Sequence, residues 1–393
     1  MSQSRDGQSR DSIVITSAAR TRMGAFQGGL SRLSATELGA VAIREALSLG
    51  KIAPDEVGEV IMGCVLPAGL GQAPARQAAL GAGLPESVPC ATLNKVCGSG
   101  MKATSLAADL IAAGSADVVV AGGMESMSNA PYLLDKARDG YRLGHGRLVD
   151  HMFLDGLEDA YDRGRAMGTF AEDTAQHYQF TREAQDDYAL ASLERARSAI
   201  AAGRFDAEIV PAGGIATDEQ PGRAKPEKIP LLKPAFRERG TVTAANSSSI
   251  SDGAAVLVVT RMSVAEAAGV APLAVIRGHA SHAQALAWFT TAPVFAMRKL
   301  MERLGWRAAD VNLFEINEAF AVVALAAMRE LDLPHDKVNV NGGACALGHP
   351  IGCSGARIVV TLLSALRVRG LKRGIASLCI GGGEATALAV ELI

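Results

Sequence analysis

The sequence has few aromatic residues and almost no net charge, and both shortages exclude classes of function. Phe, Trp and Tyr make up 4% of the 393 residues, which argues against a binding surface rich in Trp and Tyr. The formal charge of −2 provides no basic footprint for nucleic acid or an anionic membrane, so we expect neither partner. Hydrophobic residues account for 49% of the chain, enough for one or two packed cores.

Targeting signals and long apolar runs are also missing. The first twelve residues, MSQSRDGQSRDS, are polar and lack the apolar core of a signal peptide, so we expect them to form a disordered tail. No apolar run reaches the roughly 18 residues that a membrane-spanning helix needs. The last three residues, Glu391-Leu392-Ile393, are not a peroxisomal address. We therefore expect a cytoplasmic protein.

The cysteines lack the spacing of redox or metal motifs. Six are scattered along the chain, at Cys64, Cys90, Cys97, Cys345, Cys353 and Cys379. None forms a CxxC pair or a Cys/His pair at zinc-ligand spacing, so we expect free thiols, no metal site and no thiol oxidoreductase. The sequence has no P-loop or dinucleotide fingerprint either, and a tightly bound cofactor is not expected.

Short apolar runs alternate with helical patterns, which predicts an α/β fold. Asp117–Ala121 (DVVVA) is typical of a strand covered on both faces, whereas Ala35–Leu49 and Ser99–Ala113 have helical periodicity. Between about 130 and 240 the chain becomes richer in charge, His and Tyr and then in Pro and Lys. We interpret this part as an insertion on the sheet core.

Two distant segments resemble each other and predict a duplicated core. The first is CGSG at 97–100, followed by an Ala-rich helix and VVVAGGMES; the second is GCSG at 352–355, followed by a helix and IASLCIGGGEA. A functional site is expected at the seam between two such halves.

Two cysteines lie where α/β proteins place functional groups. Cys97 lies where a loop becomes a helix, and the free N–H groups of a first turn stabilise a thiolate and lower its pKa. Cys379 ends an apolar strand before three glycines, whose N–H groups can turn toward an oxyanion. For either cysteine alone, a buried inert thiol is the more common case.

A histidine and an asparagine occupy similar positions. His349 lies in a Gly- and Pro-rich loop before a helix, where it is an acid/base group or a loop histidine bonded to the backbone. Asn317 follows the apolar strand 311–316. It either caps the next helix or holds a water or a carbonyl.

Together these motifs closely resemble the thiolase family over nearly the whole chain. They are NKVCGSG at 94–100, GTVTAANSSSISDGAA at 240–255, NEAF at 317–320, NVNGGACALGHPIGCSGAR at 339–357 and CIGGG at 379–383. The resemblance implies an α/β thiolase fold, a duplicated five-layered αβαβα core with an inserted loop domain. The implied parts are an N-terminal half at 1–129 plus 241–271, a loop domain at 130–240 that covers CoA, and a C-terminal half at 272–393.

The resemblance also implies a role for each candidate. Cys97 becomes acylated, His349 activates its thiol, and Asn317 holds a water that stabilises an enolate oxygen together with His349. Cys379 exchanges a proton with the α-carbon of acetyl-CoA. The backbone N–H groups of Cys97 and Gly381 form a second oxyanion hole.

The implied reaction is the reversible Claisen condensation of two acetyl-CoA to acetoacetyl-CoA and CoA, with CoA as a substrate and not a cofactor. Candidate CoA contacts are Ser248, Arg223, Met167 and Phe320. Family members are dimers or tetramers, so a homo-oligomer is expected.

Three segments depart from common family patterns and leave the acyl chain length open. They are Ala166-Met167-Gly168, Asn246–Ser249 and Trp288–Pro293. The bulky Phe289 favours a short acyl group. The alternatives are a 3-ketoacyl-CoA thiolase of fatty-acid degradation, a ketosynthase-like condensing enzyme and a catalytically inactive CoA-binding protein. The second catalytic cysteine argues against a ketosynthase, and the complete set of four residues argues against an inactive protein.

Overall fold

The computed structural model describes residues 11–393, and the first ten residues of the expected disordered tail lie outside that range. The strands are β1 (Ile13–Thr21), β2 (Gly24–Ala25), β3 (Glu59–Gly63), β4 (Cys90–Leu93), β5 (Val118–Ser126), β6 (Tyr132–Leu134), β7 (Leu148–Asp150), β8 (Ile209–Val210), β9 (Ser251–Arg261), β10 (Ala274–Ala283), β11 (Leu313–Ile316), β12 (Arg373–Ile380) and β13 (Glu384–Leu392). The α-helices are α1 (Ala35–Gly50), α2 (Pro74–Gly81), α3 (Ser99–Ala113), α4 (Gly168–Tyr178), α5 (Arg182–Ala201), α6 (Glu219–Arg223), α7 (Met262–Ala267), α8 (Ala292–Leu304), α9 (Ala321–Leu331), α10 (Ala344–Leu347) and α11 (Ile351–Val368).

The main strands follow the same pattern twice. Their order is β11-β12-β13-β10-β1-β9-β5-β3-β4. In the first half, β3 and β5 are parallel, while β5–β9 and β9–β1 are antiparallel. In the second half, β11 and β12 are parallel, while β12–β13 and β13–β10 are antiparallel. This correspondence supports the duplication that the two CGSG-like segments predict.

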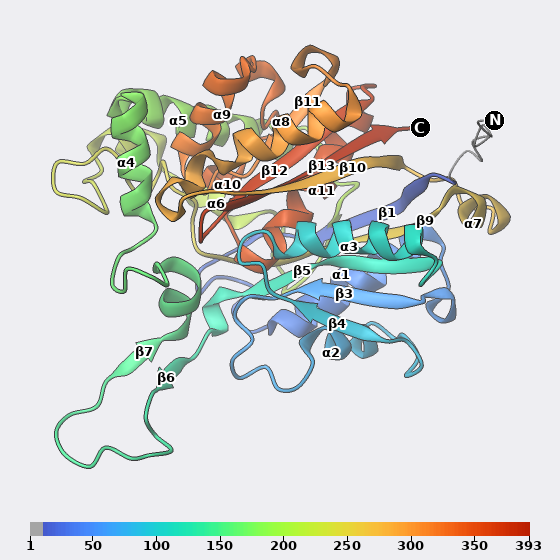
Figure 1. The fold of residues 1–393 in the computed structure, drawn as a ribbon, viewed down its shortest axis with the longest axis horizontal. Helices are drawn as coiled ribbons and strands as arrows, with labels where there is room; N and C mark the ends of the chain where they lie inside the picture. The colour runs from blue at the N-terminus through green and yellow to red at the C-terminus, as the bar shows by residue number, and fades with distance from the viewer. Residues whose placement is uncertain (1–10) are drawn as a thin grey trace, which may run out of the picture.

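The two halves meet through a short antiparallel pairing of β1 with β10. Only Val14 with Val275 and Ile15 with Ala274 are paired, whereas the strands inside each half pair over much longer stretches. The two sheets are therefore continuous at one edge, and helices occupy the space between them (Figure 1).

Alternating side chains of β5 show how the layers are built. Val119 and Ala121 pack in a core with residues of α3 and α11, whereas Val118 and Val120 pack on the opposite face with α1 and α2. A third core joins α8 and α9 to the other face of the second half. Since a strand alternates its side chains between two faces, these contacts give five layers, in the order helices, sheet, central helices, sheet, helices. The expected αβαβα core is confirmed.

The two central helices approach each other closely at their N-terminal ends. A Cβ atom on Gly100 of α3 would lie 2.8 Å from the backbone nitrogen of Ala356, and one on Gly355 of α11 would lie 2.5 Å from that of Met101. Such distances are too short for real Cβ atoms, so glycine at both positions permits the contact. The beginnings of α3 and α11, one from each half, therefore lie side by side.

Helix α11 is one of the central helices and is buried along most of its length. Its 18 residues have a mean hydropathy of 1.5, and by length and composition alone it is long and apolar enough to cross a membrane. Within the fold, however, 83% of this stretch is buried, which is typical of the central helix of a packed core.

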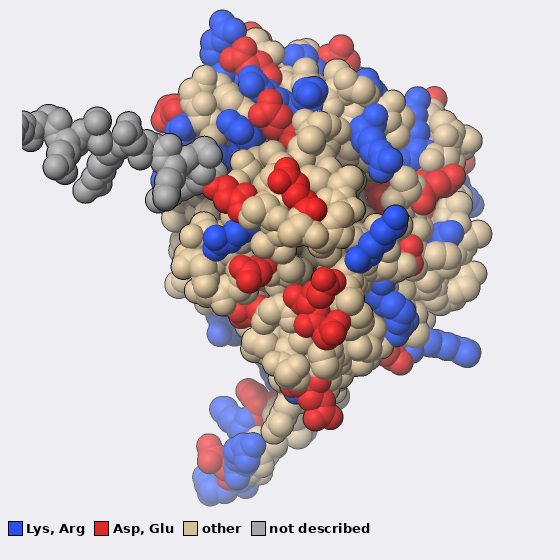
Figure 2. Space-filling view, turned by 90° about the vertical axis from the view of Figure 1, so that its right-hand side faces the viewer, with Lys and Arg blue, Asp and Glu red and all other residues tan. Residues whose placement is uncertain are grey.

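Residues between β5 and β9 form a lobe beside the two halves (Figure 1). It contains the projecting β6–β7 hairpin and the helices α4, α5 and α6. Charges of both signs are interspersed over the face shown in Figure 2, and basic side chains gather on the hairpin. The exact limits of the inserted domain stay a prediction.

Candidate active site

A small apolar cavity of about 60 Å³ lies where both halves and the lobe meet. It is lined by Val96, Cys97, Gly156, Leu157, Met167, Ser248, Phe289, Ala319, Phe320, His349, Ile351, Cys379 and Gly381. Seven of the nine predicted site residues are among them; Asn317 and Arg223 are not. Both candidate thiols and the candidate histidine therefore line one cavity, although they lie far apart in the sequence.

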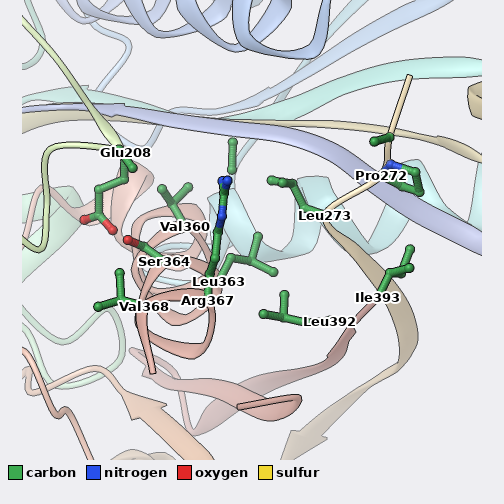
Figure 3. Close-up of a pocket in the computed structure, with 13 residues that line it drawn as sticks. Glu208, Pro272, Leu273, Val360, Leu363, Ser364, Arg367, Val368, Leu392 and Ile393 are labelled. Atoms are coloured by element: carbon green, nitrogen blue, oxygen red, sulfur yellow. The ribbon is translucent and has the colours of Figure 1, made fainter. Parts of the chain in front are cut away.

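A second cavity, about 600 Å³ in volume, shows that size alone does not locate the chemistry. It lies along α11 and the ends of β10 and β13, and its charged lining residues are Glu208 and Arg367 (Figure 3). No predicted site residue lines it.

The loop before α3 holds Cys97 in a strained turn. Val96 has a φ of 46°, a left-handed conformation that is unusual for a β-branched residue and costs free energy. The hydroxyl of Ser99 stabilises this turn: it donates to Val96 O at 2.6 Å and accepts from the Lys95 N–H at 2.8 Å. The side chain of Lys95 forms an ion pair with Glu384 at the start of β13, which joins this loop to the other half.

The backbone N–H groups of Gly381 and of Cys97 itself face the sulfur of Cys97 and lower its pKa. Burial acts in the opposite direction and is stronger, so the pKa of Cys97 is raised to about 11. The expectation of a lowered pKa from the helix position alone is therefore wrong, because a helix start cannot offset the loss of hydration. At neutral pH Cys97 is a thiol that needs a base.

Cys379 is fully buried in β12 next to this site. Burial, and then a negative charge on Cys97, raise the pKa of Cys379 well above its ordinary value. The two thiols are thus close enough that ionisation of one opposes ionisation of the other. Gly382 and Gly383 follow with φ of 90° and 84°, so glycine is required where the chain turns back into β13.

His349 is buried and held by two hydrogen bonds. Its backbone N–H donates to Ser249 O at 3.0 Å, and its Nδ1 lies 2.5 Å from the hydroxyl oxygen of Ser354. Its Nε2 has no hydrogen-bond partner among the described residues. Burial, and then the positive charge of Arg357, lower the pKa of His349 to about 3, so the imidazole is neutral.

Asn317 follows β11, and its backbone N–H donates to Ser377 O of β12 at 3.0 Å. Its amide oxygen and nitrogen are both buried and have no partner within residues 11–393. The next helix, α9, begins four residues later with Phe320 as its N-cap, so the interpretation of Asn317 as a helix cap is wrong. Buried amides are nearly always hydrogen-bonded, which indicates that this amide binds something other than the protein.

The loop Asn246–Ser249, called the serine loop below, joins the segment that carries Asn317 to the loop that carries His349. The N–H of Ser248 donates to Ala319 O at 2.9 Å, and Ser249 accepts from His349 as described above. Ser248 thereby lines the cavity, while Ser247 pairs with Phe320. The contact of Ser248 with pantetheine stays a prediction.

Glu318 is a structural residue of the site that the sequence patterns did not identify. Its buried carboxylate accepts hydrogen bonds from Tyr188 (2.9 Å) and Ser192 (2.8 Å) of α5 and from the side chain of Asn339 (2.8 Å). It therefore fixes the lobe to the segment that carries Asn317. Only the assembled fold brings these partners together.

Arg223 is not placed at the cavity. Its exposed guanidinium pairs with Glu219 of the same helix at 2.7 Å, so a role at the nucleotide end of CoA rests on resemblance alone. Within residues 11–393, no group of three His, Cys, Asp or Glu side chains is arranged to hold a metal ion.

The duplicated core and its two-thiol cavity define a class of α/β enzymes that carry an acyl group on a cysteine. Residues 13–263 match the family described as thiolase, N-terminal domain, and residues 270–392 match thiolase, C-terminal domain. The chain belongs to the thiolase family.

Similar proteins cover the chain along its whole length. Acetyl-CoA acetyltransferase 2 of Arabidopsis thaliana is 52% identical in an alignment of 392 positions that covers 97% of this chain and 97% of that one. The crystal structure of the Bacillus anthracis acetyl-CoA acetyltransferase has a TM-score of 0.95 at 43% identity, covering 98% of this chain and 100% of that one. The Acat5 thiolase from Ascaris suum, solved in complex with coenzyme A, has a TM-score of 0.93 at 42% identity, covering 97% and 100%.

Proposed function

We propose that this enzyme is an acetyl-CoA C-acetyltransferase, which condenses two acetyl-CoA to acetoacetyl-CoA and CoA and also catalyses the reverse thiolysis. The observation that carries the proposal is the presence of Cys97 and Cys379 in one cavity of about 60 Å³. Claisen chemistry requires a covalent acyl carrier and a separate base for the second substrate. The acetyl-CoA acetyltransferases that resemble this chain over its full length support the choice of substrate.

The first half-reaction loads Cys97. The thiol proton of Cys97 moves to Nε2 of His349, and the sulfur attacks the thioester carbon of acetyl-CoA. The tetrahedral oxyanion accepts hydrogen bonds from the N–H groups of Cys97 and Gly381, the same groups that face the sulfur in the free enzyme. The C–S bond to CoA then breaks, and the leaving thiolate takes the proton of Cys379. The products are acetyl-Cys97 and CoA.

The second half-reaction forms the carbon–carbon bond. The thiolate of Cys379 removes an α-proton from the second acetyl-CoA, and the resulting enolate carbon attacks acetyl-Cys97. Collapse of this intermediate releases acetoacetyl-CoA, and the Cys97 thiolate recovers its proton from His349. Acylation removes the charge on Cys97 that opposes ionisation of Cys379, so the second thiol ionises at the step that needs it.

The enolate oxygen requires its own donors. Nε2 of His349 and the amide of Asn317 are buried polar groups without partners among residues 11–393. His349 lines the cavity, and the segments that carry both residues are hydrogen-bonded to the loop Asn246–Ser249. We assign them, with a water on Asn317, to the enolate oxygen. Because these donors have no hydrogen bond to the protein, none has to be broken when they bind the enolate oxygen, and the binding costs little free energy.

Coenzyme A enters between the core and the lobe in this proposal. Ser248, Met167 and Phe320 line the cavity and contact the pantetheine end, and the Ascaris suum relative was solved with coenzyme A. Two further expectations stay predictions: a dimer or tetramer, which sedimentation would measure, and a cytoplasmic location, which fractionation would measure.

The test follows cleavage of acetoacetyl-CoA by CoA through the loss of ketoacyl absorbance, with 3-ketoacyl-CoA of four to sixteen carbons as a series. We expect the highest kcat/KM at four carbons. Absence of turnover with every member would refute the proposal and favour an inactive CoA-binding protein. A maximum at long chains would instead favour a degradative 3-ketoacyl-CoA thiolase.

A further inference from the structure

Ser354 is a fully buried hydroxyl whose position the proposed reaction has not explained. It lies on the first turn of α11, in the second of the two duplicated CGSG-like segments. Its Oγ is 2.5 Å from Nδ1 of His349 and 3.0 Å from the carbonyl oxygen of Pro350. The same oxygen therefore contacts the histidine on the side opposite to the cavity-facing Nε2.

A serine hydroxyl has one proton and two lone pairs. If it donates to Pro350 O, it can accept a hydrogen bond from Nδ1–H of His349, and Nε2 then carries a lone pair. If it donates to Nδ1, the proton of the neutral imidazole lies on Nε2. Pro350 O also accepts from the N–H groups of Cys353 and Ser354, so it stays hydrogen-bonded in both cases.

The equivalent serine of the first half provides a contrast. Ser99 donates to Val96 O and accepts from the Lys95 N–H, and both partners are backbone groups with fixed roles. Its hydroxyl has one satisfied orientation. Ser354 has two, because one of its partners is a ring nitrogen that donates or accepts according to its tautomer.

The proposed reaction needs Nδ1–H on His349 in both half-reactions. Nε2 accepts the proton of the Cys97 thiol, which requires a lone pair there, so the neutral imidazole carries its proton on Nδ1. When Nε2 holds the enolate oxygen of acetyl-CoA, it donates the proton taken from Cys97, and Nδ1 keeps its own. Without an acceptor, the N–H of Nδ1 would be buried and unsatisfied, a loss that raises the energy of both states.

We propose that Ser354 is a positioning residue that supplies the acceptor for Nδ1–H of His349 in both half-reactions. Its hydroxyl donates to Pro350 O and accepts from Nδ1–H, so Nε2 keeps its lone pair for the proton of Cys97. When Nε2 takes the Cys97 proton, Nδ1 keeps its own proton and donates it to Ser354 Oγ. No proton leaves the pair through Ser354. The inference rests on the proposed function.

The experiment compares Ser354→Ala, Ser354→Thr and a matched control on the same helix. Ser364→Ala makes the same substitution where the hydroxyl bonds only to the backbone oxygen of Arg204, at 3.2 Å. We expect Ser354→Ala to lower kcat for acetoacetyl-CoA cleavage roughly 10- to 100-fold, the usual effect of a lost hydrogen bond to a charged group. KM should be unchanged, because Ser354 does not line the cavity. Ser364→Ala should retain the wild-type kcat.

Ser354→Thr should restore kcat, since threonine on a helix can make the same bond to the carbonyl four residues earlier. If the added methyl prevents folding, Ser354→Cys, a weak acceptor of similar size, should give an intermediate kcat. A quenched single turnover with acetyl-CoA should show slower acylation of Cys97 in Ser354→Ala.

Two results would overturn the inference: a kcat of Ser354→Ala equal to that of Ser364→Ala, or a loss in which KM and melting temperature change together and neither hydroxyl nor thiol restores kcat. An inactive wild-type enzyme would instead refute the proposed function, so the two failures are distinguishable.

Discussion

We expect Phe289 to limit the length of the acyl chain, and its removal provides the most informative test of substrate choice. It lines the cavity, is 3% exposed and lies edge-on to Phe170 of α4, with ring centroids 6.1 Å apart. Phe289→Ala should open the cavity toward longer acyl groups, because it removes a large buried side chain from the cavity lining.

The size of the effect follows from the substrate. Cleavage of 3-ketohexanoyl-CoA leaves a butanoyl group on Cys97, two methylenes longer than acetyl. Burial of two methylenes contributes about 1.6 kcal/mol, or roughly 15-fold in kcat/KM. We therefore expect the ratio of kcat/KM for six over four carbons to rise about 15-fold. The fold should lose about 3–5 kcal/mol of stability, as for other buried Phe→Ala changes.

The assay is the same absorbance loss with both substrates, accompanied by thermal unfolding. Phe170→Ala is the matched control, because it removes the other ring of the pair but does not line the cavity. Its stability should fall similarly while the substrate ratio stays at the wild-type value. If Phe289→Ala folds and its ratio does not change, the reasoning is wrong, and Leu157, Met167 or Ile351 sets the limit. Phe289→Leu should show a smaller shift in the same direction.

Four further outcomes follow from the site. Cys97→Ser should form no acyl-enzyme with labelled acetyl-CoA, whereas Cys379→Ser should acylate and then stop; equal labelling in both would contradict the division of roles. Asn317→Ala should lower kcat about 10²-fold with the fold intact, as does loss of an oxyanion donor elsewhere, and a wild-type kcat would count against its role. Gly382→Ala should lower both kcat and melting temperature, because its φ of 90° disfavours any side chain. Since burial raises the pKa of Cys97 to about 11, its alkylation rate should rise about tenfold per pH unit between pH 7 and 9, and a plateau near pH 7 would show a lower pKa.

The sequence predicted the architecture well where hydrophobic periodicity carries the signal. The helix expected at Ser99–Ala113 has those limits in the structure, because an apolar face and the following Gly114 mark both the helix and its end. Strand β10, in contrast, continues beyond its apolar beginning as far as Ala283. Its second part, GHASHA, is half polar and is held in place by β13, which no local pattern can show.

The sequence predicted which residues line the site, but not the pKa values of these residues. Short motifs placed Cys97, His349 and Cys379 correctly in one cavity, whereas the sign of the pKa shift of Cys97 depends on how deeply the fold buries the sulfur. The bonds from α5 to Glu318, and the pairing of Ser354 with His349, depend on the relative positions of several elements. Arg223 was named by position alone and does not reach the cavity.

The close contact of α3 with α11 has a consequence for how this enzyme can change. The two catalytic thiols belong to different halves, Cys97 in the loop before α3 and Cys379 in β12, and the glycines at 100 and 355 permit the close contact between these halves. If the chain were cut between α7 and β10, each fragment would retain one of the two thiols and neither could complete a turnover. A substitution that widens this crossing moves both oxyanion donors apart at once. The two halves therefore have to evolve as a single unit, although they began as copies of one sequence pattern.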